Sequence, residues 1–326
     1  MDVNNYTRSG IQFIEVKNNK NLKVIFANLG ASIFKINFDN YALTRNVLNP
    51  KDFYLPGIYY GKTVGRVSNR IKGHRFRIKD EVYNIEPNEG ENVLHGGPKG
   101  ISNQFFDQNV MTDNDKVIVL YTYTAKEEID GFPGDLNIGV KYIVYADSNE
   151  IDIEFTANGT KDTVVALTNH AFFTLGCRSN RGLTLQINAD KYLKTDEQLI
   201  AIGKEDVTEA LDVRNPKKLM RDIDANELHR ERLNGYDHYF FFNNKDINVK
   251  NASISNAKFV MDIYTDFEGL QIYSSGYAAP VELHPKVEGL FDSVAIEPSD
   301  SFEKLHLLKQ GNVYSRTIKY VFNIKE

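Results

Sequence analysis

A hairpin pattern occupies residues 141–155, which read Lys141-Tyr142-Ile143-Val144-Tyr145, then Asp147-Ser148-Asn149, then Ile151-Asp152-Ile153-Glu154-Phe155. Each outer run alternates between apolar and polar or amphipathic side chains, and the triplet between them is polar and turn-forming. This arrangement is typical of two antiparallel strands joined by a tight turn, because successive side chains of a strand point to opposite faces of a sheet. The stretch therefore predicts a β-hairpin at the centre of the chain.

Further strand patterns extend in both directions from this hairpin. A second hairpin is predicted by His74 to Ile78 and Val82 to Ile85, around the turn Lys79-Asp80-Glu81. Other expected strands are Val117–Tyr123, Leu183–Ile187, Tyr239–Phe242, Phe259–Tyr264, Leu270–Tyr273, Val294–Ile296 and Arg316–Phe322.

Helical periodicity is scarce by comparison. Only Lys217–Leu233 has a helical spacing, carried by Leu219, Ile223 and Leu228, and it predicts one or two short helices. Many strands without regular βαβ alternation favour an all-β fold, either a large antiparallel β-sandwich or a barrel, with few short helices. No low-complexity or Pro/Ser-rich linker divides the 326 residues, so we expect a single domain over 1–326.

Composition excludes several classes of protein. The 39 Lys and Arg against 44 Asp and Glu give a net charge of −5, which argues against nucleic acid or an anionic membrane as the main partner. A single cysteine, Cys177, can form neither an internal disulfide nor a Cys-based zinc site. No apolar run is long enough for a membrane span, and the polar start from Met1 to Tyr6 does not resemble a targeting peptide. We expect a cytoplasmic protein.

Motifs for nucleotide or metal cofactors are missing from the sequence. It has no Gly-x-Gly-x-x-Gly after a strand, no phosphate loop ending in Gly-Lys-Ser/Thr and no His-Glu-x-x-His. The seven histidines are not paired at metal-ligand spacing. The sequence therefore predicts neither a cofactor nor a metal.

Several short segments place chemically able side chains in apolar or glycine-rich surroundings. His95 precedes Gly96-Gly97, whose conformational freedom would let the backbone approach a ligand, although a turn with an incidental histidine fits equally well. Thr168-Asn169-His170 lies between hydrophobic runs, where a core histidine bonded to carbonyls is the alternative. Glu297 closes an apolar strand before Pro298, and a carboxylate there is costly without a partner, which favours a functional role.

Seven ordered motifs together resemble the aldose 1-epimerases, also known as galactose mutarotases. They are Gly65-Arg66…Asn69-Arg70-Ile71, Leu94-His95-Gly96-Gly97, Asp130-Gly131-Phe132-Pro133-Gly134, Thr168-Asn169-His170, Gly235-Tyr236-Asp237-His238, Gly269-Leu270-Gln271-Ile272-Tyr273 and Ala295-Ile296-Glu297-Pro298. The resemblance extends from about Gly61 to Gly311. It implies a galactose mutarotase-like supersandwich with a sugar site in a surface cleft.

The resemblance also implies an activity and a set of roles. Enzymes of this family interconvert the α and β anomers of free hexoses, typically galactose and glucose, without a cofactor. The sugar would be the partner of a monomer or homodimer. By motif, Glu297 would be the general base and His170 the general acid, with His95 assisting near the ring oxygen. The sugar hydroxyls would be gripped by Arg70 and Asp237, with Asn69 and Gln271 in support.

The chain departs from the family pattern in three places, which predicts a changed rim of the site and an altered choice of sugar. They are Ser299-Asp300-Ser301-Phe302, Phe172-Phe173-Thr174 and Gln104-Phe105-Phe106. Three alternatives stay open at this point. A hexose-6-phosphate 1-epimerase would need extra cations, a glycoside hydrolase could use Glu297 with Asp237, and a non-catalytic sugar-binding protein could share the fold.

Overall fold

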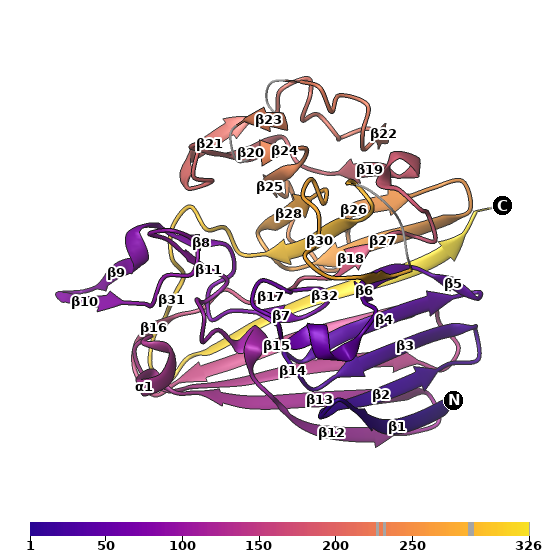
Figure 1. Ribbon diagram of the computed structural model, residues 1–326, viewed down its shortest axis with the longest axis horizontal. Coiled ribbons are helices and arrows are strands. Elements are labelled where there is room, and N and C mark those ends of the chain that lie inside the picture. Colours follow the sequence, from indigo (N-terminus) through magenta and orange to yellow (C-terminus); the bar gives the residue numbers. More distant parts are fainter. Residues whose placement is uncertain (226–227, 231–232, 286–289, 326) are drawn as a thin grey trace.

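The computed structural model describes residues 1–225, 228–230, 233–285 and 290–325, and its large sheets are antiparallel throughout. In Figure 1 the indigo N-terminal strands lie in the lower part of the view, near the long magenta and pink strands from the middle of the chain, with which they share a hydrophobic core. No helix among the described residues is both long and apolar enough to cross a membrane.

The largest sheet of the described chain has nine strands and contains the predicted central hairpin. Three strands that follow one another in the chain have ten residues each: Lys116–Ala125, Leu136–Tyr145 and Glu150–Gly159. The two predicted runs of the central hairpin pair with each other as expected. In spatial order the sheet consists of β12 (Asp107–Thr112), β13 (Lys116–Ala125), β14 (Leu136–Tyr145), β15 (Glu150–Gly159), β32 (Val313–Ile324), β27 (Phe259–Thr265), β26 (Lys250–Ser255), β19 (Thr184–Ile187) and β22 (Lys217–Lys218).

The second large sheet has eight strands. In spatial order it consists of β21 (Ala201–Asp206), β20 (Lys191–Thr195), β25 (Asp237–Phe241), β28 (Gly269–Tyr273), β30 (Val294–Ser299), β18 (Phe172–Phe173), β6 (Thr44–Val47) and β29 (Leu283–His284). The N-terminal five-stranded sheet runs in chain order through β1 (Asp2–Arg8), β2 (Ile11–Lys17), β3 (Leu22–Ala27), β4 (Ser32–Phe38) and β5 (Tyr41–Ala42).

Small two-stranded sheets and short helices complete the described elements. The sheets are β7 (Thr63–Val64) with β17 (Thr168–Asn169), β8 (Arg70–Ile71) with β11 (Val93–Leu94), β9 (Arg75–Ile78) with β10 (Glu81–Asn84), β16 (Thr163–Val164) with β31 (Leu307–Leu308), and β23 (His229–Arg230) with β24 (Leu233–Asn234). The helices are η1 (Pro50–Tyr54), η2 (Lys72–His74), η3 (Ile101–Asn103), α1 (Glu127–Asp130) and η4 (Asn180–Gly182).

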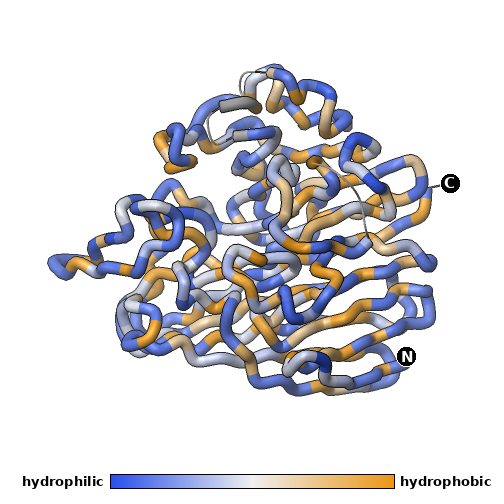
Figure 2. Tube along the Cα trace, in the orientation of Figure 1, coloured by the Kyte–Doolittle hydropathy of each residue, from blue (hydrophilic) through white to orange (hydrophobic). Residues whose placement is uncertain are grey.

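The core follows from the alternation seen in the sequence. Figure 2 shows hydrophobic and hydrophilic residues alternating along the long strands. One apolar cluster reaches from Ile14 to Phe322 and includes residues of all three large sheets, for example Val140 and Ile272. The prediction of a single domain over 1–326 stays a prediction.

The predicted helices over Lys217–Leu233 are wrong for the residues that the structure describes; residues 226, 227, 231 and 232 lie outside them. Lys217 and Lys218 form a strand that pairs with Leu185 and Thr184 of β19. Residues 219–225 form turns and a bend, and Leu228 has a 3-10 conformation; Leu219 and Leu228 are buried in the core. Sheet pairing and burial of these leucines prevailed over a weak helical spacing.

Candidate active site

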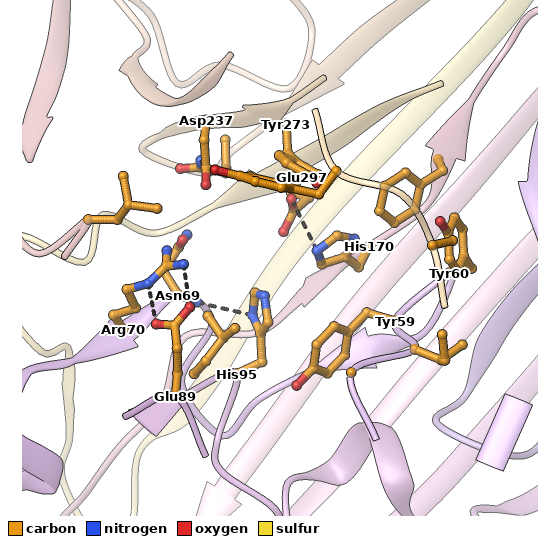
Figure 3. Close-up of a pocket in the computed structure, with 18 of the residues that line it drawn as sticks. Tyr59, Tyr60, Asn69, Arg70, Glu89, His95, His170, Asp237, Tyr273 and Glu297 are labelled. Atoms are coloured by element: carbon orange, nitrogen blue, oxygen red, sulfur yellow. Dashed lines mark hydrogen bonds and ion pairs between the residues drawn. The ribbon is translucent and has the colours of Figure 1, made fainter. Parts of the chain in front are cut away.

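A cavity of about 540 Å³ is lined by all seven residues that the sequence predicts for the site. It lies where the eight-stranded sheet faces the small sheet of β8 and β11, so segments far apart in the chain meet there (Figure 3). The predicted residues in its wall are Asn69, Arg70, His95, His170, Asp237, Gln271 and Glu297.

One wall of the cavity is built on three neighbouring strands, β25, β28 and β30. Gln271 of β28 is directly opposite Glu297 of β30, and it is also paired with Tyr239 of β25. Asp237 precedes Tyr239 by two residues, so it lies on the same face of the sheet as Gln271. The Gln271 Nε2 donates a hydrogen bond of 2.6 Å to Asp237 Oδ1. Strand register thus places an amide and two carboxyl groups side by side.

His170 reaches the same wall from the segment between β17 and β18. Phe172 of β18 pairs with Ala295 of β30, and continuing this antiparallel register brings His170 opposite Glu297. Backbone hydrogen bonds of 2.8 Å hold the histidine in place, from its N–H to the Lys62 carbonyl and from the Gly61 N–H to its carbonyl. The imidazole Nε2 is 3.4 Å from Glu297 Oε1, and both side chains are buried (Figure 3). The register therefore creates a carboxyl–imidazole pair.

The opposite wall comes from β8, β11 and the turns beside them. Asn69 and His95 both adopt left-handed backbone conformations, with φ of 60° and 52°. A Cβ on Gly96 would be 1.9 Å from the Gly65 carbonyl oxygen, so only glycine allows the two motifs to approach this closely. The Asn69 N–H donates to His95 Nδ1 at 3.2 Å. A neutral His95 therefore carries its proton on Nε2 and acts as a donor there.

Two residues that the sequence did not single out complete this wall. Glu89 accepts two hydrogen bonds from Arg70, at 2.6 Å from Nε and 2.8 Å from NH2. The Tyr59 ring packs against both histidines, with ring centroids 4.8 Å from His95 and 5.8 Å from His170. Glu89 lacked a signal because it lies among other acidic residues of a loop, whereas a Tyr pair between Gly57 and Gly61 was a usable one.

Burial shifts the protonation of the carboxyl–imidazole pair toward its neutral forms. It raises the pKa of Glu297 well above its ordinary value, an effect that Asp237 reinforces and Arg70 opposes. Burial also lowers the pKa of His170 to about 4. The pKa of His95 falls well below its usual range through burial, with His170 and Arg70 adding to the effect. His95 is therefore neutral, and the proton of the pair can move between Glu297 and His170.

Four buried polar atoms in the wall have no hydrogen-bond partner among the described residues. They are Asn69 Nδ2, His170 Nδ1, Gln271 Oε1 and Glu297 Oε2. Buried polar groups are nearly always paired, so a cluster of unpaired ones points to a ligand that supplies the missing bonds. A polyhydroxylated ligand would suit them, because each hydroxyl group can both donate and accept a hydrogen bond.

The same cavity contains a geometry that is compatible with a metal ion. Donor atoms of His95, His170 and Glu297 lie within 4.8 Å of one another. Because His95 Nδ1 accepts the Asn69 N–H, only its Nε2 would be available to a metal. The expectation of no metal stays a prediction.

The departures from the family pattern have different positions relative to the cavity. Phe172 lines it, whereas Ser299 to Phe302 do not. Asp300 instead bonds the Tyr314 hydroxyl and the Arg316 guanidinium in the interior. The expectation that this segment forms a rim of the site is therefore wrong, because the strand end turns into the core. Phe105 is exposed and also lies outside the wall.

An antiparallel sandwich with a buried carboxyl–imidazole pair in a cavity is suited to an enzyme class that moves protons on small molecules. Residues 12–321 match the family model described as aldose 1-epimerase, and the chain belongs to this family. The family's enzymes are isomerases.

The chain is similar to named relatives across most of its length. It is 30% identical to the aldose 1-epimerase of Escherichia coli over 82% of this chain and 79% of the relative. It is 28% identical to the galactose mutarotase of Sus scrofa over 84% and 82% of the two chains. The solved galactose 1-epimerase of Lactobacillus acidophilus superposes with a TM-score of 0.88 at 24% identity, covering 100% and 99%. An aldose epimerase homologue from C. elegans gives 0.86 at 26% identity, covering 97% and 100%.

Proposed function

We propose that this chain interconverts the α and β anomers of free hexoses such as galactose and glucose, with Glu297 and His170 as the acid–base pair. The proposal is carried by the contact of 3.4 Å between the two side chains in the wall of the cavity. Family membership supports the reaction class, and the roles of individual residues rest on the geometry.

The reaction needs one proton acceptor and one proton donor. Glu297 takes the proton from the C1 hydroxyl while His170 gives one to the ring oxygen, so that the C1–O5 bond breaks and an aldehyde forms. Rotation about C1–C2 exposes the other face of the carbonyl, and ring closure returns both protons. The pair holds one proton before and after ring opening: in the reactive form it is on His170, and after ring opening it is on Glu297, where burial favours it in the free site as well. Each such transfer contributes about a hundred- to ten-thousand-fold in rate.

The burial of the pair favours this sequence of events. Ring opening converts a carboxylate and an imidazolium into two neutral side chains, and burial favours the neutral form of each, as the shifted pKa values of Glu297 and His170 show. Ring opening is therefore favourable from the charged form of the pair, which the same shifts make the minor form of the free site. The same shifts make Glu297 a stronger base and His170 a stronger acid.

The remaining wall suits the task of holding the sugar while C1 turns. Arg70 and Asp237 offer charged groups to the distal hydroxyls, and a neutral His95 presents its Nε2–H as a donor. Asn69 Nδ2 and Gln271 Oε1 are buried and unpaired, so sugar hydroxyls would satisfy them. Fixed contacts of this kind supply the orientation that catalysis requires.

The charges of the wall support a neutral sugar over a phosphorylated one. Among the described lining residues, Arg70 is the single Arg or Lys, against the carboxyl groups of Glu89, Asp237 and Glu297. Asp237 bonds to Gln271 at 2.6 Å, which suits a gripping carboxyl better than the second reacting carboxyl of a glycosidase. A monomer or homodimer in the cytoplasm stays a prediction.

Polarimetry on freshly dissolved α-D-galactose and α-D-glucose tests the proposal. We would compare the wild type with Glu297→Gln and His170→Asn, and subtract the uncatalysed rate. Glu209→Gln and His74→Asn are matched controls, because both residues lie outside the cavity and Asn tolerates the left-handed backbone at position 74.

We expect each site variant to lose about a hundredfold or more in rate, and both controls to keep it. A wild type that equals the blank on both sugars would refute the free-hexose reaction. Full activity in Glu297→Gln would refute the assignment of the base.

A further inference from the structure

The loop between β10 and β11 carries Glu89, whose carboxylate occupies one complete edge of the Arg70 guanidinium. The two hydrogen bonds, 2.6 Å from Nε and 2.8 Å from NH2, form a bidentate pair. The side chains of Arg70 and Glu89 are 10% and 24% exposed, and both line the cavity. Neither the sequence motifs nor the proposed chemistry gives Glu89 a task.

The loop is built to deliver this carboxylate. Glu89 and Asn92 exchange backbone hydrogen bonds of 3.0 and 3.1 Å, and Gly90 between them has a φ of 61°. Asn88 bonds the backbone N–H and carbonyl of Leu94 at 2.7 and 3.0 Å, which ties the loop to β11. A surface carboxylate that only solvates a loop does not need such support.

The occupied edge, formed by Nε and NH2, is one of the two edges by which arginine recognises anions with a pair of donors. A guanidinium binds carboxylate and phosphate groups with two parallel N–H donors, and here an internal carboxylate already accepts both. Although burial lowers it, the bonds to Glu89 and the nearby Asp237 and Glu297 raise the pKa of Arg70, which stays charged. An incoming anionic sugar would have to displace Glu89 or approach three carboxyl groups of the wall.

We propose that Glu89 is a specificity-determining residue: its carboxylate occupies the Nε/NH2 edge of Arg70 and adds negative charge to the wall, and so restricts the cavity to neutral aldoses. Sugars with a carboxylate or phosphate group are excluded by this internal competitor. The inference rests on the proposed function and extends it by naming the residue that sets the substrate class. Loss of the carboxylate at position 89 converts Arg70 into a subsite for anionic sugars.

The variant Glu89→Gln tests this because it keeps the size of the side chain and removes the charge. Its matched control is Glu91→Gln, which makes the same change of net charge two residues away, outside the cavity wall. Galactose is the neutral probe and galacturonate, which carries a carboxylate, is the anionic probe. Mutarotation rates give kcat/KM for each sugar, and titration calorimetry gives the dissociation constants independently of turnover. Thermal melting checks that both variants fold.

We expect the ratio of galacturonate to galactose, in kcat/KM and in affinity, to rise at least about tenfold in Glu89→Gln over the wild type. Glu91→Gln should keep the wild-type ratio. An unchanged ratio in a folded Glu89→Gln, or an equal rise in Glu91→Gln, overturns the inference. If the wild type turns over neither sugar but the affinity ratio still rises, the role of Glu89 stands and the proposed reaction fails.

Discussion

Two arginines from one motif, Arg66 and Arg70, show how the same chemistry can serve the fold or the site. Each is held by a bidentate carboxylate, Arg66 by Asp130 at 2.7 and 2.9 Å and Arg70 by Glu89 at 2.6 and 2.8 Å. The Arg66 side chain is fully buried, and carbonyls of Ala125 and Gly134 accept its other donors. It therefore fastens the segment around α1 to the rest of the molecule.

Arg70 differs because a cavity lies beside it. Its side chain is one of the residues that line the space where the acid–base pair meets, and its charge acts on Glu297 and Asp237. The clamp of Glu89 orients the guanidinium without enclosing it. A bidentate ion pair therefore does not reveal the role of an arginine by itself. The role follows from the guanidinium donors that the carboxylate leaves free and from whether they face other protein groups or a cavity.

The largest effect is expected for the buried arginine. Arg66→Met leaves Asp130 buried without its cation, which should lower the free energy of unfolding by about 3–5 kcal/mol. Chemical denaturation measures this loss. In the double variant Arg66→Met/Asp130→Asn, part of the stability should return, because the uncompensated charge is gone. A loss of less than about 1 kcal/mol, as for an ordinary surface ion pair, would contradict the conclusion that Arg66 serves the fold.

Arg70→Met should instead reduce activity and affect stability little. Losing hydrogen bonds from a charged group to the sugar corresponds to about 1.5–3 kcal/mol, or roughly ten- to hundredfold in kcat/KM. Glu89 would be left unpaired, but it is partly exposed to solvent. Polarimetry and denaturation on the same samples separate the two effects. A stability loss equal to that of Arg66→Met, with kcat/KM unchanged, would reverse the assignment.

The mutarotation rate should depend on pH through the single proton that Glu297 and His170 share. Below the His170 pKa of about 4 both groups hold a proton, so no acceptor remains and the rate should fall. Above the raised pKa of Glu297 both have lost it, so no donor remains. Between these limits the pair holds one proton and the rate should be flat.

The two arginines should move these limits differently. Arg70 lowers the pKa of Glu297, so Arg70→Met should shift the alkaline limit to higher pH and leave the acid limit in place. Profiles of kcat, corrected for the blank at each pH, measure both limits. An alkaline limit that stays fixed in Arg70→Met, or an acid limit that moves with it, would contradict the assignment.

Much of the fold could be predicted from the sequence, because alternation is a local property. The hairpins at 141–155 and 75–84 form as expected, since their side-chain period of two matches a half-buried sheet. The strand of Lys217–Lys218 was missed because its pairing partner, β19, is remote in the chain. A short run of polar residues carries no local sign of such pairing.

The site shows the same division between local and remote information. The seven residues expected from the ordered motifs all line the cavity. The contact of His170 with Glu297, however, depends on the register of β18 with β30, which no single segment specifies. Glu89 was missed because its loop also carries Glu86 and Glu91, and only the fold shows which of them faces Arg70. The sequence shows which residue types are available for a site, but not which side chains contact one another in the fold.

The smallest effect is expected from metal removal. Arg70 is the cation whose charge acts on Glu297 among the described residues of the cavity wall. A divalent ion held by His95, His170 and Glu297 would take over that role, and their donor atoms lie close enough to hold one. If protons are moved by His170 and Glu297 themselves, dialysis against a chelator should change the mutarotation rate by less than about twofold. Polarimetry before and after dialysis, with Zn²⁺ or Mn²⁺ added back, measures this. A rate that collapses on chelation and returns with one ion would make Arg70 a secondary cation, because His170 could not donate a proton from the nitrogen that binds the metal.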